Sequence, residues 1–464
     1  MIPGVAAGHP ATAAAGWEIL VDGGNAADAA VAACLASCVA ETVMTGLLGG
    51  GHAIYLDGPS GDVLNLDCFC TAPGLGGGCR SSKQIHLQVP FGEEIVHYAV
   101  GPGTCAVPGL PAGLQSLWKA RGRLPWPRLV EPSLRLAREG VELPVAHASC
   151  LAMLAPVLTM DAGARIYAPG GAPLEAGGHL DQPGLVTALE LVAAEGAESF
   201  YRGSLAEALL DLVAERGGLI TRDDLKAYEV AWRQPVELGW HGRRFLTREG
   251  LSGMPETVPR LPRVRGLEAS ARVVALVEAL DGEERPGHTT NLTVVDAEGS
   301  ACVLTTSLGL GSGDFLPGLD LHLNSMLGET DLLRGPLAPG RRVLSMMAPS
   351  LVFDRAGLEL AIGAAGGTRL RTALLLSATG LLDEGLDPVE AVERPRFHPA
   401  GEVLNAEPGV DERGLAELER RGWTVRRWAA PHHYFGGVSL IGRSGAAADP
   451  RRSGAVRTEA GLAG

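Results

Sequence analysis

The segment from Thr289 to Ser307 carries the pattern that most restricts how this chain can fold. From Thr289 to Val295 the residues alternate and include many β-branched side chains, which predicts a strand. The run Asp296–Gly299 has the composition of a turn, and Ala301–Ser307 has the composition of a returning strand. A β-hairpin is therefore expected here, with a pair of threonines at its mouth.

The chain before this hairpin is expected to be an irregular linker. Residues 248–287 contain four prolines and several arginines, which indicates a mobile segment. A threonine that opens a strand after such a linker is where an N-terminal-nucleophile hydrolase would cut itself. Cleavage between His288 and Thr289 would free an α-amine beside the hydroxyl, and an amine with a pKa of about 7.7–8.0 can act as its general base. On this segment alone, an ordinary threonine-rich hairpin is the better interpretation, because threonine is common in strands.

Short blocks rich in glycine, proline and small residues are spread over nearly the whole chain. They are Asp22–Ala33, Gly46–His52, Val107–Gly113, Phe200–Gly203, Gly217–Leu225, Gly363–Arg369, Arg394–His398 and Asp449–Arg451. In this order they resemble the landmarks of the γ-glutamyltransferase (γ-glutamyltranspeptidase) family. Each block alone is a weak match, but the ordered set identifies the chain as a member.

The resemblance implies an α+β fold of the N-terminal-nucleophile hydrolase type, a four-layer αββα sandwich of two antiparallel sheets between helices. It also implies a self-processing hydrolase or acyltransferase that works through an acyl-threonine at Thr289. Residues 1–288 and 289–464 would be the two fragments, held together as a heterodimer in one folded unit. The order of helices and hairpins along the chain favours the same layers.

Local periodicity predicts most of these elements. Helices are expected over residues 10–21, 25–39, 110–121, 127–139, 185–195 and 205–215. Strand pairs are expected at 53–56 with 63–69, at 350–353 with 358–362, and at 437–441 with 445–447. Asn25 is expected to be the N-cap of its helix, with Asp28 at the capping-box position.

The residues that match the family's catalytic positions are retained. The backbone N–H groups of Gly366 and Gly367 match the oxyanion donors, a role that suits glycine because the backbone must approach closely and can need a positive φ. Ser307 matches a hydroxyl that lies near the nucleophile. A plain turn is the alternative interpretation of the glycine pair.

The positions that match the family's substrate contacts are mostly changed. Phe69 stands where an arginine binds the glutamate α-carboxylate, and a phenyl ring cannot make that bidentate contact. Asn291 replaces the histidine of the threonine motif, and Gly309 aligns near an asparagine. Glu329 keeps an acidic residue, whereas Ser345-Met346 keeps half of a serine pair. These changes predict poor use of glutathione and another acyl donor.

Several alternatives stay open. Some relatives hydrolyse other acyl groups, such as oxamate or β-lactam side chains. Others act in the lincomycin and pyrrolobenzodiazepine antibiotic pathways, where they are linked to cleavage of a C–C bond during synthesis of an alkylproline unit. A third hypothesis is a family member that binds a ligand without processing itself. One band or two on a denaturing gel would distinguish that last case.

Composition limits partners and location. The formal charge of −14 argues against nucleic acid or an anionic membrane, and no apolar run is long enough to span a bilayer. The first residues lack a basic segment before an apolar stretch, so a cytoplasmic location is expected. The cysteines show no disulfide spacing; Cys68, Cys70 and Cys79 could suggest zinc, but buried thiols are the better interpretation. We expect a small amino-acid-derived substrate and no metal or cofactor.

Overall fold

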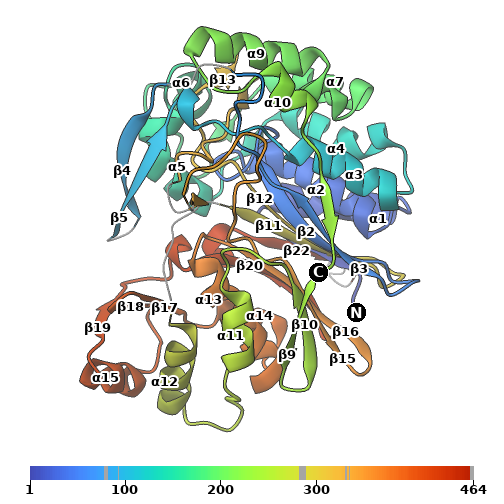
Figure 1. The fold of residues 1–464 in the computed structure, drawn as a ribbon. Helices are drawn as coiled ribbons and strands as arrows, with labels where there is room; N and C mark the ends of the chain where they lie inside the picture. The colour runs from blue at the N-terminus through green and yellow to red at the C-terminus, as the bar shows by residue number, and fades with distance from the viewer. Residues whose placement is uncertain (78–81, 92–93, 282–288, 330–331, 334, 460–464) are drawn as a thin grey trace.

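Two antiparallel sheets stacked face to face form the centre of the molecule (Figure 1). The computed structural model describes residues 1–77, 82–91, 94–281, 289–329, 332–333 and 335–459. Within these residues the first sheet has seven strands in the order β22-β1-β11-β12-β2-β3-β8. The second sheet has six described strands in the order β21-β20-β16-β15-β10-β9.

The bounds of the strands are as follows. The first sheet contains β1 (Gly4–Ala7), β2 (Gly50–Leu56), β3 (Val63–Cys68), β8 (Ala231–Arg233), β11 (Thr290–Val295), β12 (Ala301–Ser307) and β22 (Ala455–Thr458). The second contains β9 (Val236–Trp240), β10 (Arg243–Thr247), β15 (Ser350–Asp354), β16 (Gly357–Ala365), β20 (Gly437–Gly442) and β21 (Ala446–Ala448). Smaller sheets are formed by β4 (Ile85–Phe91) with β5 (Glu94–Val100), β6 (Val141–Glu142) with β7 (His179–Leu180), β13 (Phe315–Leu316) with β14 (Leu321–His322), and β17 (Phe397–Ala400) with β18 (Val403–Ala406) and β19 (Thr424–Arg427).

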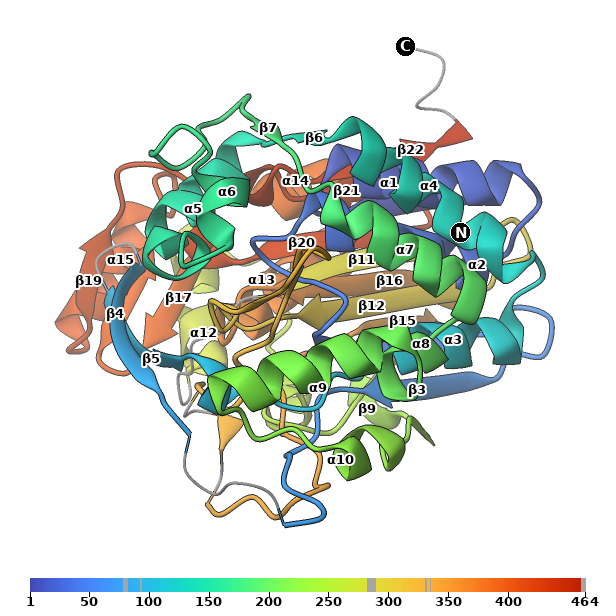
Figure 2. The same ribbon diagram turned by 90° about the horizontal axis from the view of Figure 1, so that it is seen from above.

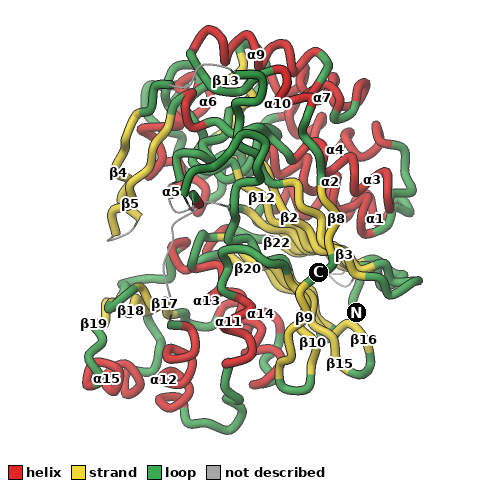
Figure 3. The backbone as a smooth tube through the Cα atoms, in the orientation of Figure 1, coloured by secondary structure: helices red, strands yellow, loops and turns green. Residues whose placement is uncertain are grey.

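Helices cover both outer faces of the sheet stack, as the view from above and the tube drawing also show (Figures 2 and 3). The first sheet is covered by a layer with α1 (Pro10–Val21), α2 (Ala26–Ala40), α3 (Leu110–Arg121), α4 (Trp126–Glu139), α7 (Gly184–Glu195), α8 (Glu198–Tyr201), α9 (Ser204–Arg216) and α10 (Arg222–Lys226). Near its β4–β5 side lie α5 (Val145–Leu158) and α6 (Gly163–Tyr167). The second sheet is covered by a layer with α11 (Met254–Thr257), α12 (Ala269–Leu280), α13 (Arg369–Thr379), α14 (Pro388–Glu393) and α15 (Glu412–Arg420).

Three buried apolar clusters fill the spaces between these four layers. One lies between α1, α2 and the first sheet and contains Leu292 and Val294 of β11. A second, which contains Val295, fills the space between the two sheets. The third lies between the second sheet and α13. The expected αββα sandwich of the N-terminal-nucleophile hydrolase type is therefore confirmed.

Helix α2 illustrates how local sequence sets these layers. Asn25 caps the helix by accepting from the N–H groups of Ala27 and Asp28, and Asp28 accepts in return from the N–H of Asn25. Every residue of α2 is buried, which suits its alanine-rich sequence because small side chains let neighbours approach on all sides. The predicted capping box is confirmed.

Both sheets take strands from each side of Thr289. In the first sheet, β11 and β12 lie between β1 and β2, which come from the start of the chain. In the second, β15 pairs with β10 across the same division. Neither part of the chain could complete either sheet alone.

The expectation of an irregular linker over residues 248–287 is wrong for much of that range. Three of the four prolines lie near the start, where two of them occupy the first turns of α11 and of the short 3₁₀ helix Val258–Arg260. Residues 269–280 lack proline and glycine, and form helix α12. Its buried side chains include Val273, Leu276, Val277 and Leu280, which recur at helical spacing and join the third cluster. Residues 282–288, including His288, lie outside the described part. No helix among the described residues combines the length and hydrophobicity needed to cross a bilayer.

Candidate active site

Thr289 directly precedes β11 and faces the second sheet. Its Oγ1 accepts a hydrogen bond of 2.7 Å from the backbone N–H of Gly366, which follows β16. Its carbonyl oxygen accepts one of 3.2 Å from Nη1 of Arg452. The residue is buried. Thr289 is thus held by donors from parts of the chain that are far away in sequence, one to its hydroxyl and one to its carbonyl oxygen.

The two glycines after β16 have a backbone conformation that other residues rarely adopt. Gly366 has φ 124° and Gly367 has φ 62°. A Cβ on Gly366 would lie 2.8 Å from Cα of Gly436 and 3.3 Å from Nη2 of Arg452. Glycine at 366 is therefore required both by its dihedral angle and by the close approach of its neighbours.

Strand register places Thr289 in one row with Ser307, Gly50 and Phe69. Thr290 pairs with Thr306, so Thr289 lies opposite Ser307 at the end of the ladder. Ser307 pairs with Gly50, and the next pair along β2 and β3 puts Gly50 opposite Phe69. Thr289 and Phe69 therefore lie at the same end of the strands of the first sheet, separated by three strand spacings of about 4.8 Å each.

Ser307 leads to a second predicted group. Its Oγ accepts a hydrogen bond of 2.9 Å from the N–H of Gly309. Gly309 has φ 68°, and a Cβ there would lie 2.9 Å from Oε1 of Glu329. Glu329 is buried. The structure therefore brings Ser307, Gly309 and Glu329 together beside the nucleophile.

Phe69 and Met346 lie in one buried apolar cluster, so the structure brings together the two predicted pocket residues that are apolar. The ring of Phe69 stacks on His52, with ring centroids 5.4 Å apart. Ser345 turns toward its own segment, since its Oγ accepts from the N–H of Met347 at 3.2 Å.

Asn291 is not part of this group. Its amide lies between the hydroxyls of Ser439 and Thr305, and a Cβ on Gly363 would meet it at 2.1 Å. Asn291 therefore links the first sheet to β16 and β20 of the second. These contacts give its predicted role in substrate binding no support.

Sequence reasoning missed Glu41 and Arg452. Glu41, directly after α2, is buried; it accepts a hydrogen bond from the hydroxyl of Thr290 and another of 2.7 Å from Thr12. Arg452 is buried beside Thr289. The only sequence signal was indirect, because the last family block, Asp449–Arg451, ends one residue before Arg452.

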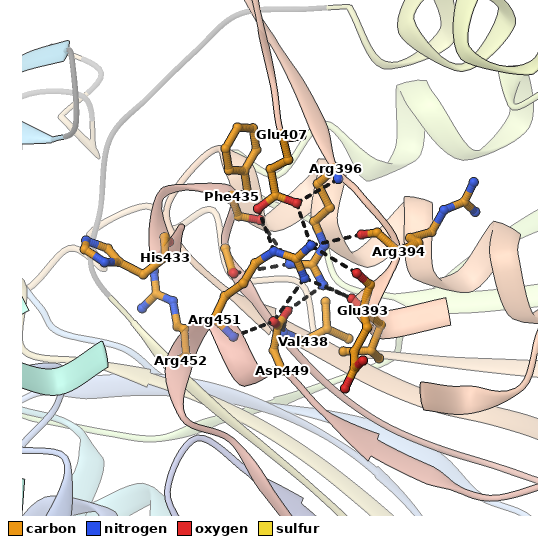
Figure 4. Close-up of polar contacts among 12 residues, drawn as sticks. Glu393, Arg394, Arg396, Glu407, His433, Phe435, Val438, Asp449, Arg451 and Arg452 are labelled. Carbon is orange, nitrogen blue, oxygen red and sulfur yellow. Dashed lines mark hydrogen bonds and ion pairs between the residues drawn. The ribbon is translucent and has the colours of Figure 1, made fainter. Parts of the chain in front are cut away.

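That last block belongs to a buried network of ion pairs (Figure 4). Arg451 pairs with Glu407 through Nη2 at 2.5 Å and with Asp449 at 3.3 Å. Asp449 also pairs with Nη2 of Arg396 at 2.5 Å and accepts from the N–H of Val438. This network fixes the turn that carries Arg452 toward Thr289.

Glu41 should make stability depend on pH. Burial raises the pKa of Glu41 to about 7, although Thr290, Thr12 and Arg452 favour its charged form. An unfolded glutamate ionises near pH 4.5. Between these values the folded state binds the extra proton, so stability falls as pH rises, by up to about 1.4 kcal/mol per unit. We expect Glu41→Gln to remove this fall, so the variant gains about 2–3 kcal/mol relative to the parent between pH 5 and 8.

Urea unfolding at pH 5 and pH 8 measures this difference, in a Thr289→Ala background so that both proteins are single chains. The matched control is Glu131→Gln, because Glu131 is exposed on α4; its stability should depend on pH in the same way as that of its parent. Parallel pH curves for Glu41→Gln and its parent would show that Glu41 is ionised in the folded protein throughout this range.

Within the described residues, no group of three or more His, Cys, Asp or Glu side chains is arranged to hold a metal ion. Cys68 and Cys70 are buried thiols, and burial raises the pKa of both far above the ordinary value. Cys79 lies outside the described residues.

Comparison with known proteins gives consistent matches over nearly the whole chain. Residues 12–258 and 263–458 match the family model described as gamma-glutamyltranspeptidase. The acylase ACY 1 proenzyme of Pseudomonas sp. (strain V22) is 30% identical, over 91% of this chain and 87% of the relative. The glutathione hydrolase proenzyme of Bacillus subtilis (strain 168) is 26% identical, over 90% and 84% respectively.

Solved structures share the fold. The cephalosporin acylase from Bacillus halodurans superposes with a TM-score of 0.82 at 22% identity, covering 98% of this chain and 96% of that one. LmbA2991HD superposes with a TM-score of 0.80 at 21% identity, covering 99% and 98%.

Proposed function

Because the chain belongs to the γ-glutamyltranspeptidase family, whose members include glutathione hydrolases and acylases, we propose that it is a self-processing enzyme that hydrolyses or transfers an acyl group through Thr289. One observation carries this proposal: the hydrogen bond of 2.7 Å from the N–H of Gly366 to Oγ1 of Thr289. A backbone donor held by a left-handed glycine favours negative charge on that oxygen, which a nucleophile develops as it loses its proton.

Processing would begin with attack of Thr289 Oγ1 on the carbonyl carbon of His288. The C–N bond between the two residues breaks, the amide nitrogen takes up a proton, and an ester joins residue 288 to Oγ1. Water hydrolyses this ester and leaves fragments 1–288 and 289–464. Several relatives are named proenzymes, which supports a processed product. The interleaved strands of both sheets would hold the fragments together as a heterodimer.

Turnover would use the amine that processing releases. This amine takes the proton of Oγ1, and Oγ1 attacks the carbonyl carbon of an amide donor. The tetrahedral oxyanion is assigned to the N–H groups of Gly366 and Gly367. Its collapse expels the leaving amine and gives acyl-Thr289, which water or an acceptor amine then cleaves. The buried guanidinium of Arg452 beside Thr289 disfavours a second positive charge, which keeps the amine in its basic form.

The pocket favours a donor other than glutathione. Phe69 and Met346 present apolar surface where the family has a carboxylate-binding arginine and the second serine of a pair. Glu329, next to Gly309 and Ser307, offers a charge for an amine-bearing group. We propose an amino-acid-derived donor with a less polar acyl group.

We expect γ-glutamyl p-nitroanilide to be a poor donor compared with a neutral acyl anilide such as butyryl p-nitroanilide. A lost arginine–carboxylate contact of about 2–5 kcal/mol corresponds to a kcat/KM lower by roughly 30-fold to several thousand-fold. Nitroaniline release measures this ratio. The intact mass of the 289–464 fragment during turnover should also show the added acyl group.

Phe69→Arg should shift the ratio toward the γ-glutamyl donor, whereas Phe69→Leu, which removes the ring without adding charge, should not. Efficient turnover of the γ-glutamyl anilide by the unmodified protein would contradict this view of the pocket. An acyl group on any residue other than Thr289 would contradict the proposed mechanism.

The other hypotheses stay predictions. Cleavage of a C–C bond in an alkylproline precursor would use the same nucleophile, so only substrate analysis separates it from amide hydrolysis. A non-processed binding protein would show one full-length band on a denaturing gel. The cytoplasmic location also stays a prediction.

A further inference from the structure

A cavity of about 910 Å³ opens at one edge of the sheet stack, beyond the row that contains Thr289. Its walls come from β2, β3 and β8 of the first sheet, the segment after β10, and residues 340–344. Thr289 and Gly366 are not among the residues that line it. The cavity is therefore separate from the nucleophile.

Positive charge dominates this cavity. Its lining includes Arg233, Arg248, Arg341 and Arg342, but only two carboxylates, Asp67 and Glu249. This is unusual in a chain with a formal charge of −14. The excess of guanidinium groups favours an anion over a cation in this cavity.

Two of these charged residues, Arg342 and Asp67, already pair with each other. Nε of Arg342 lies 3.4 Å from Oδ1 of Asp67, and Nη1 of Arg342 binds the hydroxyl of Tyr228 at 2.7 Å. Arg342 is therefore occupied by the protein. The cations left for a ligand are Arg233, Arg248 and Arg341.

Arg248 has no carboxylate partner within ion-pair distance among the described residues. Its Nη1 donates to the carbonyl oxygens of Ser345 at 3.2 Å and Met347 at 3.0 Å. Burial lowers the pKa of Arg248 to about 10, so it is still charged at neutral pH. Asp67 and Glu249 favour its charged form from a distance, but neither forms an ion pair with it, so a bound carboxylate would be its first direct ionic partner.

His52 supplies a second unsatisfied group in the same cavity. It is buried, and neither ring nitrogen has a hydrogen-bond partner among the described residues. Its Nδ1 lies 3.6 Å from Oδ1 of Asp67. Burial, the largest cause, holds the pKa of His52 far below its ordinary value, so the ring is neutral. Buried polar atoms are nearly always bonded, so these nitrogens point to a missing partner.

The cavity is joined to the nucleophile by side chains that share a face of the first sheet. His52 stacks on Phe69, the last member of the row that begins at Thr289. Three strand spacings put Phe69 about 14 Å from Thr289, a distance that roughly four extended residues would span, and the cavity begins beside Phe69 at His52 and Asp67. The two carboxyl groups of one glutamate are separated by a single side chain, which is far too short.

We propose that this cavity binds a carboxylate at the far end of an extended donor or acceptor, with Arg248 as the main contact and Arg233 and Arg341 at the rim. Guanidinium groups suit this role because they bind carboxylates through paired hydrogen bonds. The identity of the ligand as a substrate rests on the proposed acyl transfer; the anion site itself does not.

The test uses glutarate, a dicarboxylate with no bond to cleave, and isothermal titration calorimetry on the wild-type protein. We expect glutarate to bind, more weakly at high salt, and neutral glutaramide not to bind. Arg248→Gln should weaken glutarate binding at least tenfold. Arg341→Gln, at the exposed rim, should weaken it less and serves if Arg248→Gln does not fold. Arg443→Gln, which removes a surface arginine paired with Asp354, is the matched control and should change nothing.

Two kinetic arms distinguish the sources of the carboxylate. The first arm compares acyl-peptide donors that end in a carboxylate with donors that end in a carboxamide. If the cavity binds the carboxylate of the donor, Arg248→Gln should raise KM only for the donor that ends in a carboxylate. If the cavity binds the carboxylate of the acceptor, Arg248→Gln should lower only the rate of acyl transfer to amino-acid acceptors. The anion site would be overturned if glutarate did not bind, or if neither Arg248→Gln nor Arg341→Gln weakened its binding. Unchanged kinetics in both arms would overturn its role with substrates. Glutarate binding without any acyl transfer would instead count against the proposed function.

Discussion

Thr289→Ala is expected to remain one polypeptide of 48.1 kDa and to lose acyl transfer by about four orders of magnitude or more. The proposed chemistry needs Oγ1 twice, first to attack the preceding peptide bond and then to carry the acyl group. The wild-type protein should give two bands on a denaturing gel, and sequencing of the smaller fragment should begin Thr-Thr-Asn-Leu.

Two further variants make this result specific. Thr289→Ser keeps a hydroxyl at the position that the N–H of Gly366 binds, so it should still be cut. Thr424→Ala, exposed at the start of β19, should behave as the wild type. A wild-type fragment that begins at Thr290, or cleavage of Thr289→Ala, would rule out Thr289 as the nucleophile of processing.

Asp449→Ala is expected to lower the free energy of unfolding by about 3–5 kcal/mol. The substitution removes the carboxylate that pairs with Arg396 and Arg451, both buried, and that accepts from the N–H of Val438. Two guanidinium groups would then lie in the interior with one carboxylate, Glu407, between them. Urea unfolding in the Thr289→Ala background measures the loss on a single chain.

Asp354→Ala is the matched control, because Asp354 also pairs with an arginine, Arg443, but on the surface. Solvent screens such a pair, so its removal should have a far smaller effect. Equal losses from the two substitutions would mean that the network in Figure 4 contributes no more than a surface ion pair.

Sequence predicted the elements whose signals are local. The helix over 10–21 was predicted with the bounds of α1, and the capping box of Asn25 and Asp28 located the start of α2. The hairpin around Asp296–Gly299 followed from its turn residues and β-branched strands. The sequence does not reveal helix α12, because the prolines on both sides of it indicate an irregular segment.

The candidate site was only partly visible in the sequence. The glycine pair stands in a recognisable block, and Thr289 and Ser307 stand at the open end of the predicted hairpin. Glu41 lies 249 residues from Thr290, and Arg452 lies 163 residues from Thr289. A single sequence carries no signal for contacts of this range, which depend on how two sheets and two helical layers meet.

The pairing of β1 with β22 would allow the chain to be joined at its ends and opened at another place. Gly4 lies opposite Thr458, so the two ends of the described fold are neighbours in one ladder, and β11 is the next strand along. A short covalent bridge between those ends would let the polypeptide be opened before Thr289 instead. Such a circular permutant would carry Thr289 as its first residue from synthesis onward, apart from an initiator methionine. Assembly of the site would then be separated from the act of cutting.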